Sequence, residues 1–275
     1  MSTYLLGRRV TFATMLALII LTAMMASPAT AVTNIDACQT LDKFGETYRV
    51  TQDLSICGLT DCLIVANDRI TIDLQGHQIV SDCPTPAMGI TDAAIARDGI
   101  IVKNGTISFF FVGIDLAVST RTTVRNVTAS ANLFGIGVGS QSLVKDCHVH
   151  DNSLTGVTGG DRVQIHGCDA SENAIGITGG AQCLITSNDV SSNRFLGIGA
   201  GERCTVSHNV ANENGVGGGI AVGAKSLVTS NVANINERLG ISVVCPSTVT
   251  NNTATGNGSV NYEFVGDGCH TNNNN

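Results

Sequence analysis

The chain has 275 residues, a formal net charge of −7, and 43% hydrophobic residues, enough to build one packed core. The negative charge argues against nucleic acid and against anionic membrane surfaces as partners. Aromatic residues make up only 4% of the chain and Trp is absent, which argues against a strongly aromatic platform for sugar binding.

Residues 1–31 are predicted to be a secretory signal peptide. Arg8 and Arg9 supply the positive charge, an apolar stretch follows at 12–25, and Ala29-Thr30-Ala31 forms a small-residue cleavage site. A retained membrane anchor is the alternative, but the apolar run is short for a spanning helix, so cleavage is favoured. No second apolar stretch of spanning length follows. We therefore expect a secreted, periplasmic or surface protein with no membrane span after cleavage.

Residues 32–60 are expected to form a cysteine-rich N-terminal cap. Ten cysteines suit an oxidising compartment. The candidate disulfide cysteines of the N-terminal region are Cys38, Cys57, Cys62 and Cys83. The pairs Cys38–Cys57 and Cys62–Cys83 are one arrangement, although sequence alone does not choose among the three pairings of four cysteines.

A fixed repeat follows in residues 61–270. Gly-aliphatic pairs recur every 20–22 residues, starting at Gly113, Gly135, Gly156, Gly176, Gly197, Gly219 and Gly240. An asparagine column keeps the same period, at Asn132, Asn152, Asn173, Asn193, Asn214, Asn236 and Asn257. Such a period indicates a solenoid. The glycines are expected to take turn conformations that other residues resist.

The residues between these columns alternate as in strands. Eight positions before each asparagine of the column stands a β-branched residue: Val124, Val144, Ile165, Ile185, Val206, Val228 and Val249. Apolar and polar positions alternate with period 2, so each repeat is expected to hold two or three short strands. The fold class is therefore an all-β, single-stranded, right-handed parallel β-helix, because parallel crossovers prefer that hand. Asn188, Asn209, Asn231 and Asn252 are expected to stack as an inward asparagine ladder.

The remaining cysteines fall one repeat apart. Cys147 and Cys168 share one inward column, and Cys183 and Cys204 share another; each pair is either a disulfide between neighbouring rungs or two stacked free thiols. Cys245 and Cys269 are candidates to fasten the last rung. Residues 271–275 are polar and low in complexity, so a disordered tail is expected there.

Two segments resemble exported right-handed β-helix repeat proteins of the pectate-lyase-like superfamily. Ile70 to Ile79 reads TIDLQGHQI after its first residue and is similar to the opening motif of that group, and Lys103 to Ile107 resembles its next rung. The resemblance implies the fold over most of residues 38–269. It implies no reaction, because the superfamily holds lyases, polygalacturonases, epimerases and noncatalytic members, and none of their catalytic motifs occurs in this chain.

One outward patch of ionisable residues is the candidate site. His148, Asp169 and Asp189 fall on three consecutive rungs, and the neighbouring columns add Arg125, Lys145, His166 and His150. Asp169 and Asp189 are candidate ligands of calcium, the one cofactor considered. Arg125, His150 and His166 are candidate ligand-binding residues for a uronate. His148 or Lys145 could take the proton α to the uronate carboxylate, as in β-elimination. The alternative is a solvated surface without function.

Two classes of function remain open. The first is an exported scaffold or glycan-binding surface protein whose partner is an acidic polysaccharide or another surface glycan. The second is a polysaccharide lyase that uses His148, Lys145, Asp169 and Asp189. Residues 83–98 are the longest irregular stretch and the candidate lid: a groove walled by them would favour the enzyme, and a flat face would favour the scaffold.

Overall fold

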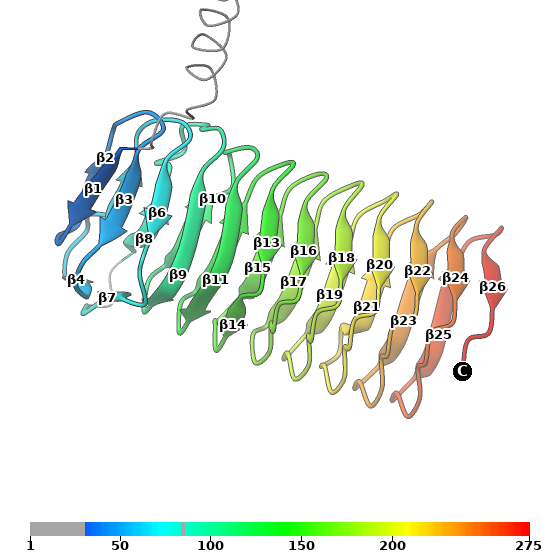
Figure 1. Ribbon diagram of the computed structural model, residues 1–275. Coiled ribbons are helices and arrows are strands. Elements are labelled where there is room, and N and C mark those ends of the chain that lie inside the picture. Colours follow the sequence, from blue (N-terminus) through cyan, green and yellow to red (C-terminus); the bar gives the residue numbers. More distant parts are fainter. Residues whose placement is uncertain (1–30, 84–85) are drawn as a thin grey trace, which may run out of the picture. The chain divides into compact units, whose positions relative to one another are not determined.

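The computed structural model describes residues 31–83 and 86–275, so the expected signal peptide lies outside the described residues. The unit Val32–Asn275 is an elongated coil in which strands from successive repeats lie side by side (Figure 1). Its strands form two parallel sheets, here called sheet A and sheet B, and no α-helix occurs among the described residues. Within this part of the chain, nothing helical is long and apolar enough to span a bilayer. The coil is a right-handed parallel β-helix, as predicted.

Sheet A has 15 strands. They are β1 (Val32–Ile35), β3 (Thr47–Val50), β4 (Leu54–Ile56), β6 (Thr71–Asp73), β7 (Gln78–Ser81), β9 (Ile101–Ser108), β11 (Thr123–Ser130), β13 (Leu143–Lys145), β14 (His148–His150), β16 (Gln164–His166), β18 (Leu184–Thr186), β20 (Thr205–Ser207), β22 (Leu227–Thr229), β24 (Thr248–Thr250) and β26 (His270–Asn272).

Sheet B has 11 strands. They are β2 (Gln39–Leu41), β5 (Leu63–Val65), β8 (Met88–Thr91), β10 (Val112–Leu116), β12 (Phe134–Val138), β15 (Thr155–Gly159), β17 (Ile175–Gly179), β19 (Leu196–Ala200), β21 (Gly218–Val222), β23 (Leu239–Val244) and β25 (Val260–Val265).

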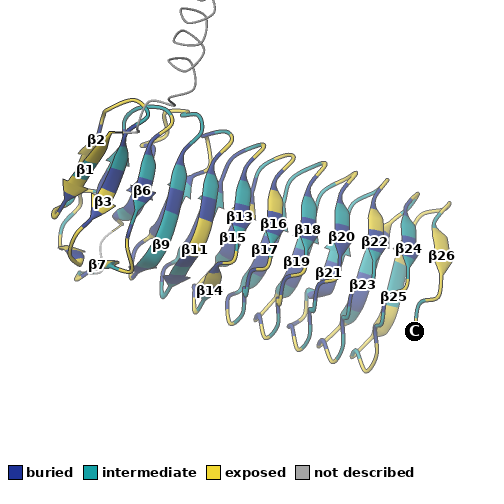
Figure 2. Ribbon diagram, in the orientation of Figure 1, coloured by how far each residue is buried: buried dark blue, intermediate teal, exposed yellow. Residues whose placement is uncertain are grey.

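The predicted inward columns form the core. All seven β-branched residues from Val124 to Val249 are fully buried, and in short strands of sheet A such as β13, β16 and β18 the buried residue lies between residues that are partly or fully exposed (Figure 2). Two asparagine ladders run beside them: the first runs from Asn132 to Asn257, and the second from Asn188 to Asn252. In the second ladder, the backbone N–H and the side-chain amide of each asparagine donate to the Oδ1 atom of the asparagine on the next rung, as Asn188 does to Asn209 at 3.0 and 2.9 Å. The ladders satisfy buried backbone groups at the bends, where strand pairing is interrupted.

Residues with positive φ mark the bends of each rung. One bend of each rung, here called the first corner, carries Asn104, Asn126, Asp146, Gly167, Ser187, His208, Ser230, Asn251 and Asn273, with φ between 50° and 65°; Asn104 and Asn126 lie inside β9 and β11, and the later residues follow short strands of sheet A. Short polar residues and glycine tolerate this left-handed conformation better than most. The chain therefore changes direction at the same place in every rung.

The conformation expected for the repeated glycines is wrong. None of the glycines of the Gly-aliphatic pairs has a positive φ, and they lie within the strands of sheet B. They are needed for space instead. A Cβ on Gly135 would lie 2.5 Å from the carbonyl oxygen of Gly156 and 3.0 Å from the amide nitrogen of Asn152. The glycine thus makes room for the asparagine ladder of the next rung.

The suggested pairing of the N-terminal cysteines is also wrong. The disulfides are Cys38–Cys62 and Cys57–Cys83. Strand pairing gives the reason: Gln39 lies opposite Leu63, so the cysteines just before them stack on successive rungs. Disulfides Cys183–Cys204 and Cys245–Cys269 join neighbouring rungs as well, whereas Cys147 and Cys168 are buried free thiols.

The two ends of the coil are built from stacked strands as well. The expected N-terminal cap, residues 32–60, contains β1 to β4, which pair with later strands in the same two sheets. The expected disordered tail is ordered: β26 pairs with β24, and the side chain of Asn274 extends the second asparagine ladder by accepting from Asn252 at 3.0 Å. The tail follows the same stacking rule as the rungs before it.

Candidate functional site

Three of the predicted residues form a basic column on the outer face of sheet A. Arg125 of β11, Lys145 of β13 and His166 of β16 lie opposite one another in the strand register. Their neighbours Val124, Val144 and Ile165 are fully buried, so the alternation of a strand directs the three basic side chains outward. Adjacent strands of a sheet lie about 4.8 Å apart, and this distance sets the spacing of the column.

A groove accompanies two of these residues. It has a volume of about 320 Å³ and is lined by Leu143, Lys145, Gln164, His166, Leu184 and Thr186. These residues lie on strands β13, β16 and β18. Each strand contributes two residues to the groove, one before and one after its buried middle residue. The groove therefore combines apolar side chains with two basic ones, an arrangement suited to a ligand that has both an apolar face and negative charge.

A second set of predicted residues follows the first corner. His148, Asp169 and Asp189 lie on successive rungs and are joined by parallel bridges. The His148 Nδ1 and Asp169 Oδ2 atoms are 3.8 Å apart, and the side chains are 70% and 47% exposed. Each aspartate accepts a hydrogen bond from a serine of its own rung: Ser171 donates to Asp169, and Ser191 donates to Asp189 at 2.7 Å. These carboxylates are solvated and partnered.

The first corner separates the two sets. Between Lys145 and His148 the chain passes through Asp146, which has a positive φ, and through the buried Cys147. The Lys145 Nζ atom lies 3.5 Å from the Oδ2 atom of Asp146, the corner residue of its own rung. His150 is 2.8 Å from Asp151, also within its own rung. The structure thus brings Arg125, Lys145 and His166 together, and separately His148, Asp169 and Asp189, on either side of a bend.

The candidate calcium ligands do not make a complete site. Calcium takes six to eight oxygen ligands, whereas Asp169 and Asp189 supply only two carboxylates, each with its Oδ1 atom accepting from a serine hydroxyl. Over residues 31–83 and 86–275, no group of three or more His, Cys, Asp or Glu residues is arranged to hold a metal ion. The donor set does not fit the ion, and we derive no chemical step through it.

The basic column extends further than the sequence indicated. Strand pairing places Arg49, Asp73 and Lys103 in line with Arg125. Lys103 Nζ lies 3.0 Å from Asp73 Oδ2. Burial opposes ionisation of Asp73, but hydrogen bonds from Asn104 and Lys103 outweigh it and hold the pKa of this carboxyl below its usual value. Lys103 lies one regular step of 22 residues before Arg125, but the spacing changes to 30 and 24 residues beyond it, so a search at the regular period misses Asp73 and Arg49.

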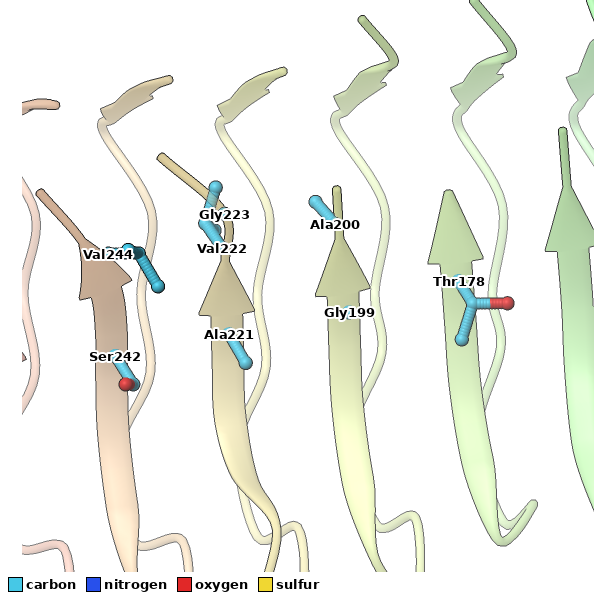
Figure 3. Close-up of a pocket in the computed structure, with 8 residues that line it drawn as sticks. All are labelled: Thr178, Gly199, Ala200, Ala221, Val222, Gly223, Ser242 and Val244. Carbon is cyan, nitrogen blue, oxygen red and sulfur yellow. The ribbon is translucent and has the colours of Figure 1, made fainter. Parts of the chain in front are cut away.

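Another groove lies on sheet B and was not predicted. Figure 3 shows its lining: Thr178, Gly199, Ala200, Ala221, Val222, Gly223, Ser242 and Val244. Its volume is about 400 Å³, larger than that of the sheet A groove, but it carries no charged side chain. Small residues at outward positions leave this trough because little side chain stands above the strands.

The expected lid does not cover either groove. Within the stretch 83–98, residues 84–85 are not described, and Met88–Thr91 form β8 inside sheet B. None of the described residues of the stretch lines the groove beside Lys145 and His166.

Comparison with known proteins identifies the fold. The A-modules of the mannuronan C-5 epimerases AlgE4 and AlgE6 from Azotobacter vinelandii match with TM-scores of 0.62 and 0.51, at 13% and 10% sequence identity. The AlgE4 match covers 92% of this chain and 91% of that chain, and the AlgE6 match 93% and 92%. A double mutant of the periplasmic alginate epimerase AlgG matches with a TM-score of 0.51 at 12% identity, over 89% of this chain and 75% of that chain.

Sequence comparisons give no closer assignment. No protein-family model matches the chain, and no curated protein matches it. The chain therefore shares its parallel β-helix fold with these epimerases. At these identities the likeness establishes the fold and leaves the function to the residues on its surface.

Proposed function

We propose that this protein is an exported glycan-binding β-helix that holds an acidic polysaccharide against the outer face of sheet A. The observation that carries the proposal is the basic column of Arg125, Lys145 and His166 on three successive strands, two of them beside a groove of about 320 Å³. A polymer with one carboxylate per sugar presents charges at regular intervals, and a column with one basic group per rung presents their complement.

Local charge outweighs net charge in this argument. The chain as a whole is negative, so it has no general attraction for polyanions. At short range, however, Arg125 and Lys145 count for more than distant charges, because charges beyond about 8–10 Å are largely screened at physiological salt; Asp146, 3.5 Å from Lys145, offsets part of this charge. Leu143 and Leu184 add apolar surface to the groove, and this surface suits the C–H face of a sugar ring.

Independent features agree with export and with a glycan partner. Four disulfides suit an oxidising compartment. The structural relatives that match above a TM-score of 0.5 are named as epimerases of mannuronan or alginate, which are polymers of acidic sugars. These names support a polyuronate as the first ligand to test.

A polyuronate lyase is the second candidate. The pair His148 and Asp169, whose nitrogen and oxygen atoms are 3.8 Å apart, favours it because a carboxylate beside a histidine can orient the ring as a base. In this reading His148 takes the proton α to a uronate carboxylate, and Lys145 or Arg125 neutralises that carboxylate. The corner between Lys145 and His148 opposes this arrangement, so we rank it second.

Calorimetric titration with alginate oligomers tests the proposal. Replacing Arg125, Lys145 and His166 together by Ala should weaken binding by about 0.6–3 kcal/mol, roughly 3- to 150-fold, at 0.2–1 kcal/mol for each exposed charged contact. Binding should also weaken with added salt. The matched control is Lys225→Ala, which removes an exposed basic residue from a different bend of the coil.

Three results would decide between the readings. Equal affinity of the triple variant and the wild type would overturn the proposed groove, as would an equal loss in the Lys225→Ala control. A rise in the ultraviolet absorbance of unsaturated uronate during incubation would establish the lyase instead. In that case, replacing Asp169 and Asp189 by Asn would test whether the second set of residues takes part.

A further inference from the structure

Two buried thiols lie just beyond the first corner from the basic column. Cys147 follows Lys145 by two residues and Cys168 follows His166 by two, and both thiols are essentially inaccessible. The strand register pairs Lys145 with His166, and a bridge pairs His148 with Asp169, so the two cysteines between these pairs occupy equivalent positions on neighbouring rungs.

A second cysteine pair shows what this stacking allows. Cys183 and Cys204 have the same separation of 21 residues, and they form a disulfide across a Cα–Cα distance of 4.6 Å. Adjacent rungs lie about 4.8 Å apart, which is within the range of roughly 4.4–6.8 Å that a disulfide spans. Stacking therefore already places the backbones of Cys147 and Cys168 at disulfide distance.

The two thiols occupy the head of an asparagine ladder. On later rungs the same position holds Asn188, Asn209, Asn231, Asn252 and Asn274. The Cys168 backbone N–H donates to Asn188 Oδ1 at 2.9 Å, as the asparagines do in turn. The side-chain amides of these asparagines also donate to a backbone carbonyl of the preceding rung. The cysteine thiols make the same contact at a longer distance: Cys147 Sγ lies 3.7 Å from the carbonyl oxygen of Val124. A thiol bonds less well here than an amide, but only a thiol can be oxidised.

The thiols are also unequal. The hydrogen bond from Cys168 lowers the pKa of Cys147 despite its burial. The same contact, together with burial, raises the pKa of the Cys168 thiol. The thiolate is the nucleophile in thiol–disulfide exchange, so the difference makes Cys147 the attacking group.

We propose that Cys147 and Cys168 are a redox-active pair that forms a fifth disulfide, cross-linking the two rungs that carry Lys145 and His166. The reactant is a low-molecular-weight disulfide such as oxidised glutathione. The Cys147 thiolate attacks one of its sulfurs and releases one glutathione thiolate. Cys168 then loses its proton and attacks Cys147 Sγ, which releases the glutathione bound there. Two protein thiols are oxidised, and one small disulfide is reduced to two thiols.

Burial sets when the exchange takes place. Neither sulfur is reachable in the closed coil, so the small disulfide reacts during folding or through local opening of the first corner. Closing a loop of this length should raise the melting temperature by about 6–12 °C. The proposal concerns the thiols alone and stands or falls independently of polysaccharide binding.

The experiment compares the protein with a variant that continues the ladder. The wild type and Cys147→Asn/Cys168→Asn are incubated, and separately refolded, in glutathione redox buffer. The wild type should lose both free thiols, yield a peptide cross-linked between Cys147 and Cys168 by mass spectrometry, and melt at the higher temperature. The double variant keeps the other four disulfides and should show no change in melting temperature.

Single variants test whether Cys147 attacks. Cys168→Ser should acquire one glutathione at Cys147, because no second thiol is left to release it. Two free thiols that persist in the wild type even after refolding, or a cross-link without any rise in melting temperature, would overturn the proposal. A Cys168→Ser variant that acquires no glutathione would overturn the assignment of Cys147 as the attacking group.

Discussion

Replacing a single buried asparagine of the second ladder should destabilise the coil far more than its small side chain suggests. Asn209 is fully buried, and its side-chain amide donates to the oxygen of Ile185 at 2.9 Å and to Asn231 Oδ1 at 3.0 Å. Its own Oδ1 accepts from the backbone and the side chain of Asn188. In Asn209→Ala the Asn188 side chain keeps its bond to Ile165, but the Asn188 backbone N–H loses its partner inside the core.

The magnitude follows from these contacts. A buried N–H left without a partner costs about 1–3 kcal/mol, and the lost side-chain bonds add about 1 kcal/mol. We therefore expect Asn209→Ala to lower the free energy of unfolding by about 2–4 kcal/mol, measured by guanidinium chloride denaturation followed by circular dichroism. The control is Asn212→Ala, three residues along the same rung, which removes one half-exposed bond to the Asn234 N–H and should cost only about 0.5–1 kcal/mol. Losses that agree within about 0.5 kcal/mol would refute the reasoning, because surface and ladder positions would then be equivalent.

Two further predictions concern the last rung and a buried acid. Replacing Cys245 and Cys269 by Ser opens a disulfide across 24 residues and should lower the free energy of unfolding by about 3 kcal/mol in the same assay; an unchanged value would contradict it. Asp92 is buried, and burial raises its pKa despite a hydrogen bond from Ser119. The folded protein therefore favours the protonated form of Asp92. The stability that this form contributes is fully present below the unfolded-state pKa of about 3.9 and is lost as pH rises through the higher pKa of Asp92 in the folded state. Asp92→Asn should flatten this decline in unfolding free energy with pH, and an unaltered slope would exclude Asp92 as its source.

The middle of the coil is predictable because stacking repeats one set of constraints. Val124, Val144 and Ile165 recur where a narrow interior needs β-branched residues, and Asn188 and Asn209 recur where buried backbone groups need partners. Once the period is known, each of these positions follows from counting. The same logic placed Arg125, Lys145 and His166 side by side, and the strand register confirms that prediction.

Counting fails where the rung length changes. Val32 pairs with Thr47, Arg49 with Asp73 and Asp73 with Lys103, at separations of 15, 24 and 30 residues. The regular period therefore does not reach Arg49 and Asp73, whereas Lys103 lies one regular step of 22 residues before Arg125 and could have been counted. The same irregularity hid the rule that cysteines pair across successive rungs, and it led to the wrong N-terminal disulfides.

Bends are the other feature that counting does not reveal. Lys145 and His148 are three residues apart and both point outward, which in the sequence alone is consistent with neighbouring columns of one face. The positive φ of Asp146 places a corner between them. Asp tolerates this conformation but does not require it, and Ser187 adopts it at the equivalent position two rungs later, so residue type alone does not locate the bend.

This corner bears directly on the choice between binding and catalysis. A catalytic site needs a base, an acid and a charge-stabilising group that converge on one reacting atom. Asp146 and Cys147 stand between Lys145 and His148, and among the described residues no side-chain hydrogen bond or ion pair joins the two columns. Lys145 and His166 share a groove, whereas His148 and Asp169 project beyond the bend. Binding to a polymer needs only that like groups repeat along one direction, and stacked rungs supply this repetition in every column. The geometry that opposes convergence of the two columns therefore favours a role in binding for the column of Arg125, Lys145 and His166.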